Sequence, residues 1–140
     1  MKALNLKRIL LPVLLIVFIS SAYSQSNAKK YFKKAERNLS SKNYEKAYAG
    51  FTKVIELEPD NADAYVFRGL SKYYLEVYED AKIDFDRAIK LVPDYAEVYN
   101  FRGIVRDELG DRKGACEDWN KAFDLGFDPA FDLIEAFCDE

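Results

Sequence analysis

Apolar side chains recur every three or four residues through most of the chain, and this is the period of an amphipathic helix. The period predicts six helices, over residues 28–41, 44–58, 62–75, 78–91, 96–109 and 112–125. Pro59 and Pro93 separate one pair of helices from the next, because proline does not continue a helix. The pattern therefore predicts an all-α chain built from three helical pairs.

The chain also matches itself when it is shifted by 34 residues. The sequence YVFRG at residues 65–69 returns as YNFRG at residues 99–103. The same shift in the other direction brings Tyr31, Tyr44 and Phe51 onto equivalent aromatic positions. We therefore divide the chain into repeats 28–61, 62–95 and 96–129, followed by a truncated unit over residues 130–140.

The turn inside each repeat is not uniform in sequence. Gly110 supplies a flexible residue in repeat three, whereas repeat two has Glu76 and Val77 at the same place. A left-handed backbone at Glu76 would cost roughly 1 kcal/mol or more. We therefore expect a turn of a different shape in repeat two.

Several positions of the repeat carry a fixed kind of residue. Repeat two has them as Tyr65, Gly69, Ala81, Phe85, Ala88 and Pro93. This pattern resembles the tetratricopeptide-repeat family, over 102 of the 116 residues that follow residue 24. The resemblance implies a right-handed superhelical solenoid of three helix-turn-helix repeats with a C-terminal capping helix. The chain departs from the family pattern at Ala35, which replaces a glycine, and at Asn38, Lys72 and Arg106, where tyrosine is usual.

Residues 130–140 have the features of the capping helix that the last repeat of a solenoid needs. We expect Asp128 to be the N-cap residue and Pro129 to occupy the first helical position. Ala130, Leu133 and Phe137 then form one apolar stripe toward repeat three.

The N-terminal segment has the pattern of a signal peptide. Three cations, Lys2, Lys7 and Arg8, precede an apolar run over residues 9–19, and the small residues Ala22 and Ser24 follow. An apolar run of this length reaches about half of a roughly 30 Å hydrocarbon core. We predict that residues 1–24 are removed near Ser24/Gln25 and that residues 25–140 are exported to the periplasm or secreted, with no membrane insertion afterwards. An uncleaved membrane anchor is the alternative.

Charge is distributed unevenly along the chain. Without residues 1–24 it carries 18 basic and 24 acidic residues, a net charge of −6. This balance argues against a nucleic-acid partner, which needs a basic face. Residues 25–61 are nevertheless basic, with a net charge of +3, whereas residues 96–140 have −7. We expect one basic and one acidic end.

The sequence contains few groups for catalysis. Histidine, the commonest general base and metal ligand, does not occur. Glycine-rich phosphate loops and cysteines at metal-binding spacing do not occur either. We interpret the many carboxylates as solvated surface, and we predict that the chain is not an enzyme and takes no cofactor or metal.

The two cysteines, Cys116 and Cys138, fall on the second helix of repeat three and on the capping helix. Export would place them in an oxidising environment, so we predict a disulfide between them. Two buried free thiols remain the alternative.

Arg68 and Arg102 occupy the same repeat position, and Asp84 and Asp118 accompany them. Repeat one has Lys34 and Gly50 at these places. A repeat-specific ion pair is the simplest interpretation, with ligand binding as the alternative.

In the tetratricopeptide-repeat family, one face of each first helix lines a concave groove that receives peptides. The equivalent residues here are Phe32, Leu39, Val66, Phe67, Leu70, Tyr73, Tyr74, Asn100, Phe101 and Ile104. Large apolar surfaces of this kind usually mark an interaction site, unless neighbouring repeats cover them. The residues that bind a C-terminal carboxylate in some relatives are replaced, for example by Phe32, Glu36 and Glu97.

The resemblance and the missing chemistry together predict a protein-protein interaction module. It would bind a peptide segment of another envelope or secreted protein. The second possibility is a self-assembling structural or scaffold element of the cell envelope that stacks through its repeat-one end.

Overall fold

The computed structural model describes residues 25–138, and all of its regular secondary structure over these residues is helical. A helix over residues 25–40 is followed by α2 (Tyr44–Leu57), α3 (Ala62–Tyr74), α4 (Tyr78–Leu91), α5 (Ala96–Glu108), α6 (Arg112–Asp124) and α7 (Ala130–Phe137). The ends of α2 to α6 differ from the predicted ends by at most one residue. The predicted signal peptide, residues 1–24, lies outside the described residues.

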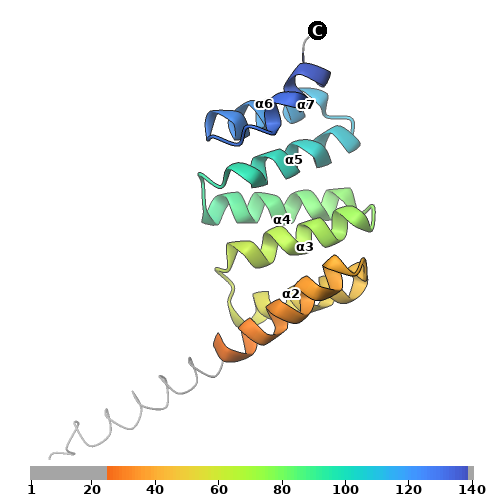
Figure 1. The fold of residues 1–140 in the computed structure, drawn as a ribbon, viewed down its shortest axis with the longest axis vertical. Helices are drawn as coiled ribbons and strands as arrows, with labels where there is room; N and C mark the ends of the chain where they lie inside the picture. Colours follow the sequence, from red (N-terminus) through yellow and green to blue (C-terminus); the bar gives the residue numbers. More distant parts are fainter. Residues whose placement is uncertain (1–24, 139–140) are drawn as a thin grey trace, which may run out of the picture.

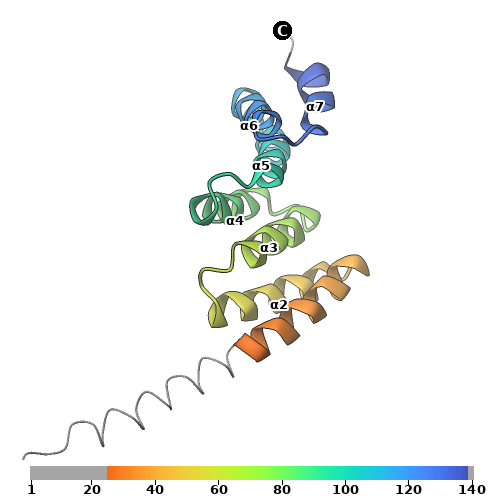
Figure 2. The same ribbon diagram turned by 60° about the vertical axis from the view of Figure 1, so that its left-hand side comes forward.

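The helices stack in chain order along the longest axis of the molecule, as Figure 1 shows. The helix over residues 25–40 lies at one end and α7 at the other, and the turned view in Figure 2 shows the same order. Equivalent helices begin 34 residues apart, at Ala62, Ala96 and Ala130. The predicted all-α solenoid is confirmed.

A glycine makes room for a large aromatic ring in repeats two and three. A Cβ atom on Gly69 would lie 2.8 Å from the Phe85 ring, and one on Gly103 would lie 2.5 Å from Nε1 of Trp119. Phe85 and Trp119 are both fully buried. Close approach of the two helices of a repeat therefore depends on these glycines, since interiors pack too densely to accept an added methyl group.

The turn in repeat two has the same shape as the turn in repeat three, so the expected difference is wrong. Glu76 has a φ of 61°, in the left-handed region where Gly110 has 81°. The Val77 N–H donates to the Lys72 carbonyl at 3.0 Å, and the Asp111 N–H donates to the Arg106 carbonyl at 2.8 Å. This six-residue closure is the Schellman motif, and its hydrogen bonds impose the same backbone on glutamate as on glycine.

The capping helix begins at Ala130, where its predicted bounds begin, but its N-cap residue is not the predicted one. Pro129 is the N-cap residue of α7, with no side-chain hydrogen bond to the helix end, so the prediction for Asp128 is wrong. The Asp128 backbone carbonyl accepts from the Phe131 N–H instead, in a turn that leads into the helix. Ala130 is buried against Ala115, Trp119 and Ala122 of α6, as a cap over repeat three requires.

A disulfide joins this cap to the third repeat. Cys116 of α6 and Cys138, just after α7, are bonded to each other, with their Cα atoms 5.7 Å apart. The bond therefore ties α7 to α6, the helix that it covers.

Candidate functional site

The ten side chains predicted to line a groove do not share one environment. Val66 and Asn100, at equivalent positions of α3 and α5, are only 3% and 7% exposed. Val66 belongs to a core cluster that includes Val98 of the next repeat, which explains its burial. The prediction for these two residues is wrong, because the angle of a side chain around its own helix does not reveal what the neighbouring repeat covers.

The phenylalanines of the set pack mainly between repeats. The rings of Phe32 and Phe67 lie 5.4 and 5.5 Å from the buried ring of Phe51, and they lie 5.6 Å from each other. Phe101 lies 6.0 Å from the buried ring of Phe85. These three residues are partly buried, and they stabilise the joints between repeats.

Three of the predicted residues meet at a pocket near the turn end of the first two repeats. Leu39, Leu70 and Tyr74 line it together with Tyr44 and Lys42, and its volume is about 520 Å³. Tyr74 is 51% exposed, and its ring stacks on Tyr44 with centroids 4.7 Å apart and planes 12° apart. We call this the tyrosine pocket.

Tyr44 was absent from the predicted set, although its sequence contained a signal. It recurs as Tyr78 at the same repeat position. Each of these tyrosines begins the second helix of its repeat, and Tyr44 contacts Tyr74 of the following repeat. Prediction from the first helices alone could not include it.

Tyr73 and Ile104 are partly buried and pack against core clusters. The ring of Tyr73 lies 5.4 Å from Tyr74 and 5.7 Å from Tyr78, and it packs against the core of repeats two and three. Burial, with the nearby Glu108 carboxylate, raises the pKa of its phenol. Ile104 packs partly buried against the cluster around Trp119.

The predicted ion pairs are confirmed in repeats two and three. Nε and Nη2 of Arg68 donate to the two carboxylate oxygens of Asp84 at 2.9 and 2.7 Å. Arg102 binds Asp118 in the same two-pronged way at 2.8 and 2.7 Å. Burial opposes the charge of Arg102, but its bonds to Asp118 and to Asp86 raise the pKa of the guanidinium above its ordinary value. Such paired hydrogen bonds to ionised groups are the strong ones.

The same ion pairs explain why Lys72 and Arg106 stand where the family usually has tyrosine. Lys72 lies 2.8 Å from Oδ2 of Asp84, and Arg106 lies 3.2 Å from Oδ2 of Asp118. The carboxylate of Asp84 is 2% exposed. Each buried carboxylate is therefore held by two cations of its own repeat.

Over residues 25–138, no group of three carboxylate or thiol side chains is placed to hold a metal ion. Within the same range, no helix has both the length and the apolar character that crossing a membrane requires.

No model of a known protein family matches the chain, and no curated protein matches it. Solved structures do match its fold. The second tetratricopeptide-repeat (TPR) domain of human RPAP3, in complex with the HSP70 peptide SGPTIEEVD, has a TM-score of 0.78 at 23% identity, over 84% of this chain and 99% of that one. The first TPR of Spaghetti (RPAP3), bound to the HSP90 peptide SRMEEVD, has 0.76 at 21% identity, over 81% and 91%. The Arabidopsis OM64 TPR domain has 0.75 at 22% identity, over 81% and 98%. The chain thus has the TPR fold.

Proposed function

We propose that this TPR chain is a non-catalytic interaction module that binds a peptide segment of another envelope or secreted protein. The tyrosine pocket carries the proposal, because it presents Tyr74 and Tyr44 to solvent while most of the other predicted groove residues are packed. Two structures with the same fold hold short peptides, as their descriptions state. Tyrosine is also enriched among the residues that dominate binding energy.

The lining of the pocket favours an apolar anchor on the partner. Leu39 and Leu70 supply aliphatic walls, and the stacked tyrosine rings supply a flat one. Lys42 is the charged member of the lining, so an acidic residue beside the anchor would gain a favourable contact. We therefore propose a peptide with one large apolar side chain flanked by a carboxylate.

Export is part of the proposal, and two features support it. The first is the cationic and apolar pattern of residues 1–24, which is typical of a signal peptide. The second is the disulfide between Cys116 and Cys138, since such bonds persist mainly in oxidising compartments. N-terminal sequencing of the protein from its native compartment tests it, with Gln25 as the expected first residue.

Self-assembly is a second candidate function, and the charge distribution favours it. Residues 25–61 carry a net charge of +3 and residues 96–140 carry −7. The acidic end also exposes the paired rings of Phe123 and Phe131. Light scattering at low and high salt would distinguish a monomer from a stack of copies joined basic end to acidic end.

Affinity capture of partners from the native envelope tests the interaction itself. The bait is the protein and two variants, Tyr74→Ala in the tyrosine pocket and Ile83→Ala on α4. Ile83 is 61% exposed and does not line the pocket, so it controls for the loss of any exposed apolar side chain. We expect capture by the parent protein and by Ile83→Ala, and loss with Tyr74→Ala. Equal capture by all three would refute the pocket as the site.

A further inference from the structure

Repeat one lacks the buried carboxylate that organises the other two repeats. In repeat two, Asp84 accepts from Arg68 and Lys72, and repeat three repeats the arrangement around Asp118. The residues of repeat one at the three positions of Arg68, Lys72 and Asp84 are Lys34, Asn38 and Gly50. Repeat one therefore keeps two hydrogen-bond donors, the lysine and the asparagine amide, but glycine replaces the carboxylate that would accept from them.

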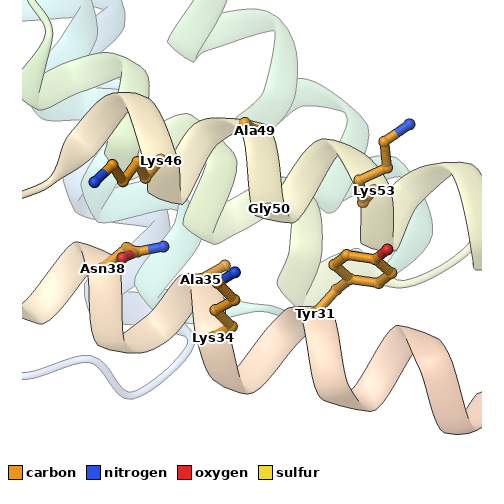
Figure 3. Close-up of a pocket in the computed structure, with 8 residues that line it drawn as sticks. All are labelled: Tyr31, Lys34, Ala35, Asn38, Lys46, Ala49, Gly50 and Lys53. Carbon is orange, nitrogen blue, oxygen red and sulfur yellow. The ribbon is translucent and has the colours of Figure 1, made fainter.

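A pocket lies where that carboxylate would be. It has a volume of about 460 Å³ and lies between the helix over residues 25–40 and α2. Figure 3 shows Lys34 and Asn38 reaching up from the first helix, with Lys46 and Lys53 on either side of Gly50 on α2. We call it the lysine pocket, and none of its lining residues is acidic.

The lysines of this pocket are mostly without counter-charges. Lys53 donates to Glu56 at 2.6 Å. The ion pairs found among residues 25–138 include neither Lys34 nor Lys46. Lys34 and Lys46 therefore line the pocket without a carboxylate to pair with.

Local packing explains why the chain does not supply this carboxylate itself. A Cβ atom on Gly50 would lie 2.7 Å from the Cβ atom of Ala35, closer than such atoms approach. In repeats two and three, the position of Ala35 is held by Gly69 and Gly103, and Asp84 and Asp118 fit. Ala35 and Gly50 thus form a compensating pair that keeps the helices close and leaves the acceptor position open.

From this comparison we propose that the lysine pocket is a carboxylate-binding site that takes an aspartate or glutamate side chain of an acidic segment of another protein. The ligand carboxylate would accept from Lys34 and Asn38, as Asp84 accepts from Arg68 and Lys72. The volume leaves room for the peptide that carries it. The site lies apart from the tyrosine pocket, which shares none of its lining residues, and it does not depend on the proposed function there.

Binding of a defined acidic peptide tests the site. The probe is an acetylated and amidated peptide of alternating glutamate and alanine, titrated into the purified protein and followed by calorimetry. The same peptide with glutamine is the control probe, and sodium acetate tests for a free carboxylate. We expect the glutamate peptide alone to bind well, with an affinity that falls as salt is added.

Three variants assign that binding to the pocket. Lys34→Gln should weaken it by about tenfold or more, as the loss of a charge-assisted hydrogen bond implies. The double variant Ala35→Gly with Gly50→Asp should abolish it, because the introduced carboxylate fills the space as Asp84 does. Lys90→Gln, at an exposed lysine outside the pocket, should leave it unchanged.

Several results would overturn the proposal. They are failure of the glutamate peptide to bind, equal binding of the glutamine peptide, and equal affinity of Lys34→Gln and the parent. Association between copies that Lys34→Gln disperses, without peptide binding, would replace it with self-assembly. Since Lys34→Gln leaves the helix packing of Ala35 and Gly50 intact, the test stands even where the double variant fails to fold. A Tyr74→Ala variant should bind the glutamate peptide normally, which separates this site from the tyrosine pocket.

Discussion

The phenol of Tyr95 donates a hydrogen bond of 2.9 Å to Oδ1 of Asp63, 32 residues earlier in the chain. Tyr95 is the N-cap residue of α5, and Asp63 lies in the first turn of α3. The bond therefore connects the N-terminal ends of α3 and α5, the first helices of repeats two and three. Burial and then this bond raise the pKa of Tyr95 to about 12.

This raised pKa predicts a loss of stability at alkaline pH. A tyrosine in the unfolded chain has a pKa of about 10. Because the folded value is higher, the contribution is fully present below pH 10 and is lost as the pH rises through about 12. We expect the free energy of unfolding, measured with urea, to fall between pH 9 and pH 11. The fall should be smaller in Tyr95→Phe than in the parent protein. Identical decreases would show that the bond does not form in solution.

The left-handed backbone of Glu76 predicts an easy gain in stability. Glu76→Gly should raise the free energy of unfolding by about 1 kcal/mol, since glycine adopts a positive φ without the steric cost. The matched change Gly110→Ala in repeat three should lower it by a similar amount. Chemical denaturation of both variants measures this. A loss of stability in Glu76→Gly would mean that its side chain makes a contact worth more than the strain.

The buried carboxylate of Asp84 predicts a large loss of stability when its charge is removed. Asp84→Asn removes the charge that holds Arg68 and Lys72, and breaking a buried pair in this way costs about 3 to 5 kcal/mol. Asp80→Asn, on the exposed side of the same helix, should change stability by about 0.5 kcal/mol or less. Thermal unfolding compares the two. A small effect at Asp84 would mean that the two cations find water instead.

The disulfide predicts a stability that depends on the reductant. Linking residues 22 positions apart stabilises the fold by about 3 kcal/mol on the loop-entropy model. Oxidised protein should therefore unfold at a higher urea concentration than protein kept in dithiothreitol. The variant with Cys116→Ser and Cys138→Ser should match the reduced protein and be insensitive to reductant.

Repetition made the fold and the ion pairs predictable. The helix ends recur every 34 residues. The ion pair of Arg68 with Asp84 recurs at the same period as that of Arg102 with Asp118, so the prediction for one repeat supports the prediction for the next. Burial of Val66 and Asn100 did not follow from the period, because it depends on how far the next repeat overlaps the helix. The Glu76 turn shows a different limit, because the preference of a single residue argues against a conformation that the backbone hydrogen bonds of the helix end impose.

Comparison of repeat one with the other two repeats in the structure revealed a pocket that the sequence pattern alone did not predict. The departures Ala35, Asn38 and Gly50 looked independent in the sequence. In the structure they surround one pocket. Their shared location is a property of two helices crossing, which no single-helix pattern encodes.

Tyr73 and Tyr74 are neighbours in the sequence, but the structure predicts opposite consequences for their removal. Tyr73 packs against the core, so Tyr73→Ala should lower the free energy of unfolding by roughly 2 to 4 kcal/mol. Tyr74 is 51% exposed and loses mainly its stacking on Tyr44, so Tyr74→Ala should cost about 1 kcal/mol or less.

Binding should follow the reverse order once a peptide partner has been captured. Tyr74→Ala should weaken binding of the peptide by about 2 kcal/mol or more, about thirtyfold in affinity, because Tyr74 is the most exposed tyrosine of the tyrosine pocket. Tyr74→Phe should bind nearly as well as the parent, since the stacked ring is kept. Parallel melting curves and titrations of the three variants decide the question. A Tyr74→Ala protein that binds normally, or that melts as early as Tyr73→Ala, would place the partner elsewhere on the molecule.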